Sequence, residues 1–359
     1  MLLYLTPVIA ALLLILGAGL LFSGCYTLKQ GASMLGYLGR AVPLESLPKT
    51  AGEGIAGDEA DENSRFVERI QDIRRFAREE LGLRDTKNYT RYVTIDRDYL
   101  AAVVSGAAKD SFTRYEWWFP VVGKAPYKGF FNPEDARREG KKLAKKDLDV
   151  WIRPVDAFST LGWFQDPLYS YMRDYPLHAL ADLLIHELFH ATVFLKGHSQ
   201  FNEEIAEFAG REGSRLYIEK RCGADSEEYR AMLDSAADSG AFVSFIRELI
   251  LELDGVYKSD LSREEKLIQK DGRIKAAQER FAEEYESRFR RENHRGFSKM
   301  EINNAYLELY RLYYEGSPYF EDIYEKAGRD LPAFIRAAKT IRPRGDPRKQ
   351  LEAALGGSR

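Results

Sequence analysis

The sequence predicts an α+β fold in which a strand-rich segment precedes a mostly helical one. Between Tyr89 and Thr160, short apolar or aromatic runs such as YVTI, LAAVV and DVWI are separated by glycines, prolines and charged turns, a pattern typical of strands. From about Pro176 onward, apolar residues recur instead at helical spacing. Because strands come first and helices follow, the order favours α+β over an alternating βαβ fold.

The chain of 359 residues is long enough for one large domain with appendages. We expect a leader or anchor over residues 1–25, and an N-terminal segment and linker over 26–62 that ends in TAGEGIAGDEADE. The main domain is expected over residues 63–342. Residues 343–359 contain proline, glycine and charge, which predict a flexible tail.

Apolar spacing predicts where the helices lie. One begins near Phe66, and a basic helix over residues 133–146 interrupts the strands with what we interpret as a solvated face. The later helices are expected over residues 176–196, 199–220, 227–253, 262–293, 299–314 and 319–339.

The charge balance argues against a nucleic-acid partner. The chain has 53 basic and 56 acidic residues, a formal net charge of −3, and no basic stripe. We therefore expect a peptide, a small molecule or a membrane as partner. Oligomeric state does not follow from the sequence.

The N-terminus is the most apolar part of the chain. From Leu2 to Phe22, Thr6 is the only clearly polar side chain, and no Lys or Arg precedes the run. The run ends in Leu-Phe-Ser-Gly-Cys25, which resembles the bacterial lipobox, although Phe22 stands where that pattern more often has leucine. This predicts lipid modification of Cys25 and a place in the bacterial cell envelope, facing the periplasm. The alternatives are an uncleaved spanning anchor and an ordinary signal peptide.

Four of the five histidines fall between His178 and His198, around an HExxH string. On a helix, His186 and His190 share one face and can both direct a ring nitrogen at one metal ion. Zinc accepts such ligands, and Glu187 is placed to take a proton from a water on that ion. The alternative is a chance motif of core histidines.

A catalytic zinc ion needs a third protein ligand, which we expect downstream. A tight turn after Gly197 would send a second helix back antiparallel and swing Glu203 towards the histidines. Glu204 is the main rival, and His198 is a further possible donor. Glu207, one turn beyond Glu203, either hydrogen-bonds a ligating histidine from behind or is an ordinary exposed helix charge.

The combined motifs resemble a known group. HExxH followed by Asn202-Glu203-x-x-Ala206 is similar to the gluzincin class of zinc peptidases. More narrowly, residues from about Phe76 to Phe320 resemble the bacterial putative aminopeptidase family, many members of which carry lipoprotein signals. The stretches that carry this resemblance include WFPVVG at 118–123, AFSTLGWF at 157–164 and NNA at 303–305.

The resemblance implies a zincin-like fold with His186, His190 and Glu203 as zinc ligands and Glu187 as the base. It also implies that the stretch from Phe158 to Gly162 lies near the site, where Ser159, Thr160 and Gly162 would bind substrate as an edge strand. A core strand and turn is the alternative for this stretch.

Because Asn303 to Phe320 belongs to the recurring stretches, Tyr313 is our candidate for donating a hydrogen bond to the oxyanion. With 21 tyrosines in the chain, a core or surface role is the competing interpretation.

The function expected is therefore a membrane-tethered, zinc-dependent peptidase. The chain has no GxMEN exopeptidase motif, so its residues do not distinguish aminopeptidase from endopeptidase activity. A non-catalytic envelope lipoprotein with a structural or vestigial metal site is the alternative from another class. A zinc hydrolase acting on other substrates is the third reading.

Overall fold

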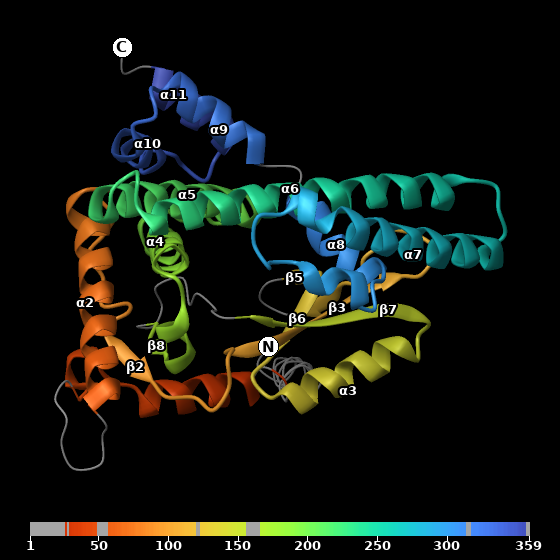
Figure 1. Ribbon diagram of the computed structural model, residues 1–359, viewed down its shortest axis with the longest axis horizontal. Helices are drawn as coiled ribbons and strands as arrows, with labels where there is room; N and C mark the ends of the chain where they lie inside the picture. Colours follow the sequence, from red (N-terminus) through yellow and green to blue (C-terminus); the bar gives the residue numbers. More distant parts are fainter. Residues whose placement is uncertain are drawn as a thin grey trace, which may run out of the picture. The chain divides into compact units, whose positions relative to one another are not determined.

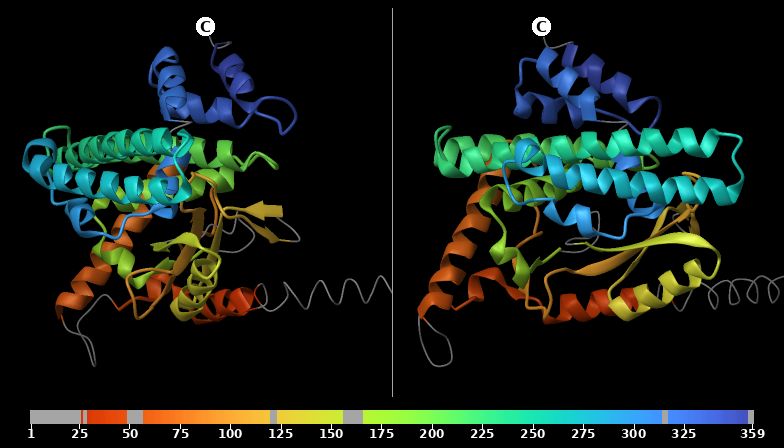
Figure 2. Two further views of the ribbon diagram at one scale, coloured as in Figure 1. Left: turned by 90° about the vertical axis from the view of Figure 1, so that its right-hand side faces the viewer. Right: turned by 45° about the vertical axis from the view of Figure 1, so that its right-hand side comes forward.

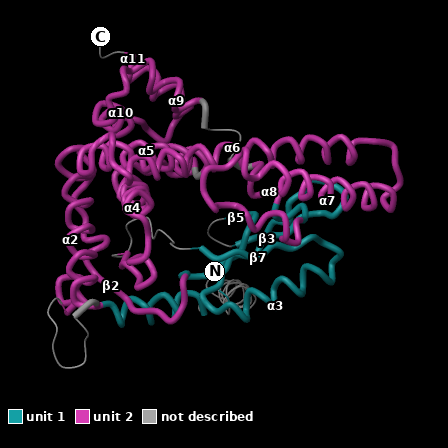
Figure 3. The backbone as a smooth tube through the Cα atoms, viewed as in Figure 1, with its two compact units in different colours: residues 1–41, 99–157, 303–306 teal, residues 42–98, 158–302, 307–359 magenta. Residues whose placement is uncertain are grey.

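The computed structural model describes residue 26 and residues 29–48, 57–119, 123–155, 166–313 and 317–356. The chain divides into two compact units (Figure 3): residues 1–41, 99–157 and 303–306 form unit 1, and residues 42–98, 158–302 and 307–359 form unit 2. Helices dominate, and the sheets are small, so the predicted mixed α+β class is confirmed. Figure 2 shows the same helices and strands from two further directions.

Unit 1 is built around a buried central strand, β3. This strand is made of small and β-branched residues and is buried over nearly its whole length, as expected of a strand covered on both faces. It pairs antiparallel with β6 on one side and with β7 on the other. Helix α3 packs against β3 and β7. The bounds are a helix over residues 29–40, β3 Ala101–Ala108, β4 Trp117–Phe119, β5 Gly123–Ala125, β6 Tyr127–Phe130, α3 Pro133–Ala144 and β7 Leu148–Val155.

The ends of α3 follow local sequence rules. Pro133 occupies the first turn, where its missing N–H is not needed, and the Asn132 side chain accepts a hydrogen bond from the backbone N–H of Glu134. The buried face of α3 carries Ala136 and Leu143, which pack in the core beside Trp117. The basic helix that the sequence predicts is therefore present, with its charges outside that core.

Unit 2 is mostly helical (Figure 1). Among its described residues, a small sheet in the order β1-β2-β8 combines an antiparallel and a parallel pair. Helix α8, Asn304–Tyr313, begins in unit 1 and continues in unit 2. The other bounds are β1 Val42–Pro43, η1 Leu44–Ser46, α2 Gly57–Glu79, β2 Arg91–Val93, β8 Leu168–Tyr169, η2 Ser170–Asp174, α4 Leu177–Thr192, α5 Ser199–Cys222, α6 Glu227–Lys258, α7 Arg263–Arg288, η3 Arg295–Lys299, α9 Ser317–Lys326, α10 Leu331–Ala338 and α11 Pro347–Gly356.

Helix α4 is the buried centre of unit 2. Pro176 precedes its first turn, and apolar residues spread nearly all round it, so eight of its residues are buried. It packs most extensively against α5 and also contacts α2 and α6. Because α4 is enclosed in this way, any polar side chain on it must find a partner or a ligand.

Helices α6 and α7 form a long antiparallel pair (Figure 1). The turn between them ends in a capping box, in which the Ser262 hydroxyl and the Glu265 carboxylate each accept a backbone N–H at the start of α7. Phe242, Phe281 and Phe297 contact one another edge-on in the core between these helices and η3.

Three segments differ from the helices that spacing predicts. Residues 319–339 form two helices, α9 and α10, because Gly328 and Arg329 adopt left-handed backbone and Asp330 caps a new start. The segment expected to be a linker contains the helix over residues 29–40 and the start of α2. The expected tail forms α11, in which Leu351 is fully buried.

Within the described residues, no helix is both long enough and apolar enough to cross a bilayer. The apolar run from Leu2 to Phe22 and the predicted lipidation site at Cys25 lie outside those residues.

Candidate metal centre

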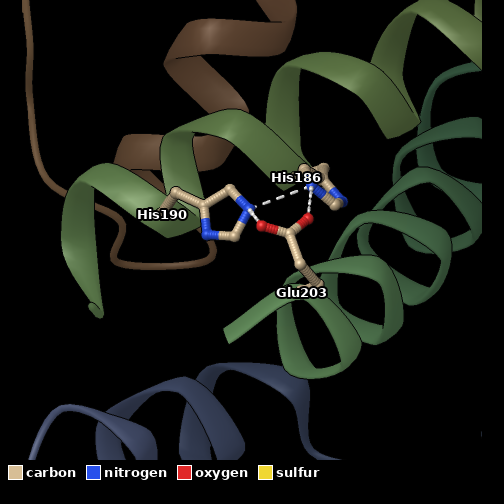
Figure 4. Close-up of side chains that lie close together, drawn as sticks. All are labelled: His186, His190 and Glu203. Carbon is tan, nitrogen blue, oxygen red and sulfur yellow. Dashed lines mark hydrogen bonds and ion pairs between the residues drawn. The ribbon is translucent and has the colours of Figure 1, made fainter. Parts of the chain in front are cut away.

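Helix α4 presents His186 and His190 on one face, as their spacing of four residues requires. The two Nε2 atoms lie 3.1 Å apart and point at a common position (Figure 4). The His190 side chain is 2% exposed and that of His186 is 22% exposed. Two ring nitrogens this close repel through their lone pairs unless a proton or a cation lies between them.

The turn between α4 and α5 brings the third group to this pair. Gly197 adopts left-handed backbone with φ of 88°, and the buried Asn202 side chain bonds both the N–H and the carbonyl of Leu195 at 2.9 Å. Asn202 thus holds the start of α5 against the end of α4. The carboxylate of Glu203, the next residue, extends from α5 to the histidines (Figure 4).

The three side chains fit a tetrahedral metal ion. Oε1 of Glu203 lies 3.5 Å from Nε2 of His190, and Oε2 lies 3.8 Å from Nε2 of His186. Zinc bonds of about 2.0–2.1 Å at tetrahedral angles place ligand atoms roughly 3.3 Å from one another. The donors of His186, His190 and Glu203 lie within 4.8 Å of one another, so a small closure of the carboxylate suffices.

The electrostatics of the site disfavour a proton on His186. Burial lowers the pKa of His186 to about 4, and the charge of His190 adds to this effect while Glu203 opposes it. Burial would raise the pKa of Glu203, but its interactions with His190 and His186 outweigh burial and lower it overall. The lowered pKa values favour a neutral imidazole at His186 and an ionised carboxylate at Glu203, the forms of these two groups that bind a metal.

Glu187 lies on α4 between the two histidines in sequence and is 8% exposed. Tyr89 lies close enough to Glu187 for the charge of the carboxylate to affect the pKa of its phenol. Burial raises the pKa of Tyr89 well above its usual value, and the charges of Glu187 and Asp166 add to this effect. Tyr89 adopts left-handed backbone with φ of 59°, and its N–H donates to the Asp166 carbonyl at 2.7 Å. A neutral phenol is thus held within electrostatic reach of the candidate base.

The rival third ligands are engaged elsewhere. Nε2 of His198 lies 2.9 Å from the Pro343 carbonyl oxygen. Glu204 pairs with Arg348 at 2.5 Å and accepts a hydrogen bond from Gln200 at 2.9 Å. Among the described residues, only Glu203 joins the two histidines in a group that could hold a metal ion.

Glu207 lies one turn beyond Glu203 on α5 and is exposed. It forms no hydrogen bond to His186 or His190 in the described part of the chain. Desolvation of its carboxylate by the surrounding protein raises its pKa although part of the side chain reaches solvent; Arg211 opposes this effect, and the charges of Glu203 and Glu204 add to it. Its predicted role behind the histidines stays a prediction.

Asp182, which the sequence analysis did not single out, lies one turn before His186 on α4. Burial raises the pKa of its carboxyl to about 7, the charge of Glu207 adds to this effect, and Arg211 opposes it. The signal was present in the spacing, because Asp182, His186 and His190 follow one another at intervals of four.

Close approach of α4 and α5 depends on Gly210. A Cβ atom at this position would lie 3.0 Å from the Asp182 carbonyl oxygen, 3.0 Å from Cβ of His186, and closer still to Oδ1 of Asp182. Only glycine allows the two helices to meet here. The distance between the histidines and Glu203 therefore depends on a residue without a side chain.

The remaining predicted site residues lie outside what the structure describes. Ser159, Thr160 and Gly162 fall among residues 156–165, and Cys25 among residues 1–25. The backbone of Tyr313 ends α8, but its side chain is not among those described. Their predicted roles stay predictions.

One comparison with known proteins identifies a relationship. A family model described as Putative aminopeptidase matches residues 25–353, which is most of the chain and includes all of the residues around the candidate metal centre. No curated protein and no solved structure matches the chain.

Proposed function

Because the chain belongs to the Putative aminopeptidase family, and is thus a member of a family of hydrolases, we propose that it is a gluzincin-type zinc metallopeptidase with a zincin-like catalytic domain. The observation that carries the proposal is the convergence of His186, His190 and Glu203, with ligand atoms within 4.8 Å of one another. Two histidines and one glutamate form a recognised catalytic zinc set, and such sets leave a coordination position open.

Zinc, when bound, supplies a Lewis acid that polarises the scissile carbonyl and lowers the pKa of water. His186, His190 and Glu203 would hold it. Glu187 would accept the proton of the attacking water and pass it to the leaving amine. Its position, buried on the same helix and next to His186 in sequence, supports this role.

An open site supports catalysis over a structural metal. A structural zinc ion has four protein ligands. In the described part of the chain, Glu204 and His198 are the nearest candidates in sequence, and both bond other groups. For a structural zinc site, Glu204 or His198 would have to break its present interaction and bind the metal as a fourth ligand.

The decisive experiment measures zinc content and peptide hydrolysis on the same preparations. We expect one equivalent of zinc in the wild type, its loss in His186→Ala and Glu203→Ala, and its retention in Glu187→Gln. In Glu187→Gln, hydrolysis should fall by about 10²–10⁴-fold, because the general base is lost. Glu204→Gln, which removes the adjacent carboxylate, is the matched control and should keep both zinc and activity.

Comparing peptides with free and with acetylated N-termini distinguishes the two activities, because an aminopeptidase requires a free N-terminus and an endopeptidase does not. Zinc bound without hydrolysis of either kind would favour a structural site or a substrate other than peptides. No zinc in a folded wild type would remove the metallopeptidase proposal.

We also propose that Cys25 is lipidated and that the chain is tethered to the bacterial envelope, facing the periplasm. The sequence Leu-Phe-Ser-Gly-Cys25 at the end of the apolar run supports this placement. Mass spectrometry of the N-terminal peptide should show a diacylglycerol-modified Cys25 and no residue before it. Intact residues 1–24 would instead indicate an uncleaved anchor.

A further inference from the structure

A pocket separate from the candidate metal centre lies in unit 2, where α2, the segment after it, η1 and α4 meet. Its volume is about 270 Å³, far more than the ~30 Å³ that one water occupies in the liquid. Four arginines line it: Arg74, Arg75, Arg78 and Arg84. None of the proposed metal ligands contributes to it.

The pocket borders the face of α4 opposite to the histidines. Leu188, which is 3% exposed, lines the pocket and lies midway in sequence between His186 and His190. At about 100° of rotation per residue, its side chain leaves the helix roughly 180° from their shared direction. The backbone N–H of Arg84 also donates to the Thr192 hydroxyl at 2.9 Å, which ties the pocket wall to the end of α4.

Positive groups outnumber negative ones around the pocket. Glu45 and Asp85 are the two carboxylates that line it, against four guanidinium groups. Two of the arginines already have carboxylate partners: Arg75 pairs with Asp72, and Arg78 pairs with Glu79 at 2.6 Å and with Asp85 at 3.5 Å.

The other two arginines lack a carboxylate partner in the described part of the chain. Arg74 donates through Nη2 to the Thr86 carbonyl at 2.7 Å, while its buried Nε has no acceptor among the described residues. Burial lowers the pKa of Arg74, with Arg78 adding to the effect and Asp85 and Glu45 opposing it. Arg84 is exposed, and its guanidinium forms no ion pair with a described residue.

We propose that this pocket binds a phosphate-class oxyanion, held by the guanidinium groups of Arg74 and Arg84, with Arg75 and Arg78 adding positive charge. An oxyanion would supply the acceptor that Nε of Arg74 lacks. Guanidinium forks bind phosphate through paired hydrogen bonds, and several oxygens allow more than one arginine to bind at once. The phosphate group could belong to a soluble phosphate or to a lipid headgroup.

Calorimetric titration of the full chain, kept in neutral detergent, tests this proposal without any readout of hydrolysis. One arm uses inorganic phosphate, and the other uses short-chain phosphatidylglycerol. We expect saturable binding of one equivalent, weakened by about tenfold or more in the double variant Arg74→Gln with Arg84→Gln. The arm with the tighter binding identifies the source of the phosphate group.

The matched control is the double variant Arg65→Gln with Arg69→Gln, which removes two exposed charges from the same helix outside the pocket. It should bind as the wild type does. Asp85→Asn should tighten binding, because it removes a competing carboxylate, and misfolding cannot produce that gain. Absence of saturable binding of both probes, or equal weakening in the control, would overturn the proposal.

Discussion

Asp182 shows how single residues of α4 respond to burial. Its carboxyl has a pKa of about 7 in the folded chain, against its ordinary value of 3.8. Between these pH values the folded state holds a proton that the unfolded state has released. The contribution of Asp182 to stability is therefore full below pH 3.8 and is lost as the pH rises towards 7.

Asp182→Asn should remove this dependence, since asparagine keeps the shape and does not titrate. A rise of about three pKa units corresponds to roughly 4 kcal/mol, so the free energy of unfolding of the variant relative to the wild type should rise by up to about that amount between pH 4 and pH 8. Denaturant unfolding at both pH values, with a chelator present, measures it. Asp271→Asn, on the exposed face of α7, should show no such trend. A pH-independent difference for Asp182→Asn would contradict the assignment.

The part of the site that lies within one helix was predictable. The shared direction of His186 and His190 follows from the helical spacing alone, because it does not depend on other elements, while the role of Glu187 stays a prediction. The prediction of Glu203 as the third ligand depended on a tight turn between the two helices, and Gly197 indicated such a turn. Asp182 shares the four-residue spacing of the histidines, but the rise in the pKa of its carboxyl comes first from burial and then from the charge of Glu207 on another helix, and spacing along α4 reveals neither.

The contact between α4 and α5 is the element-scale feature on which the proposed metal centre depends. Gly210 in α5 meets the backbone of α4 at Asp182 and the Cβ of His186. Backbone atoms of a buried helix cannot move aside as the end of a side chain can, so an added methyl group must push the helices apart.

Gly210→Ala should lower both stability and zinc affinity. Alanine favours a helix over glycine by about 1 kcal/mol, but overpacking costs about 1–3 kcal/mol, so we expect a net loss of up to about 2 kcal/mol. The shift of Glu203 away from the histidines should weaken zinc binding by about tenfold or more. Thermal unfolding and competition with a chromophoric zinc chelator measure the two effects.

Gly240→Ala in α6 is the matched control, because nothing lies within 4 Å of the added Cβ there. It should stabilise the protein by about 0.5–1 kcal/mol and leave zinc affinity unchanged. A Gly210→Ala variant that behaves in the same way would show that α4 and α5 have room to separate.

Helix boundaries divide into those that local sequence sets and those that it does not. Ser262 and Glu265 mark the start of α7 as a capping box, and Pro133 marks the start of α3 as a first-turn proline. The break between α9 and α10 was missed because apolar spacing continues through it. Arg329, a residue that rarely adopts left-handed backbone, does so beside Gly328.

At the scale of the whole molecule, the two units do not follow the order of the chain. Unit 1 takes residues from three separate stretches, and unit 2 from three others. Composition can mark linkers along the chain, but it cannot reveal which distant stretches share a core. The division predicted from the sequence, one domain over residues 63–342, could not contain this information.

The placement of the proposed metal centre within unit 2 predicts where zinc should stabilise the protein. His186, His190 and Glu203 all belong to unit 2, so the free energy of zinc binding adds to the stability of the unit that contains all three. Hydrogen exchange should therefore slow in α4 and α5 when zinc is added, by about a hundredfold at a free zinc concentration of 100 times Kd, and change little in β3 and β7 of unit 1. His186→Ala should abolish the difference. Equal slowing in both units would mean that they unfold as one cooperative structure, and that zinc holds the whole chain together.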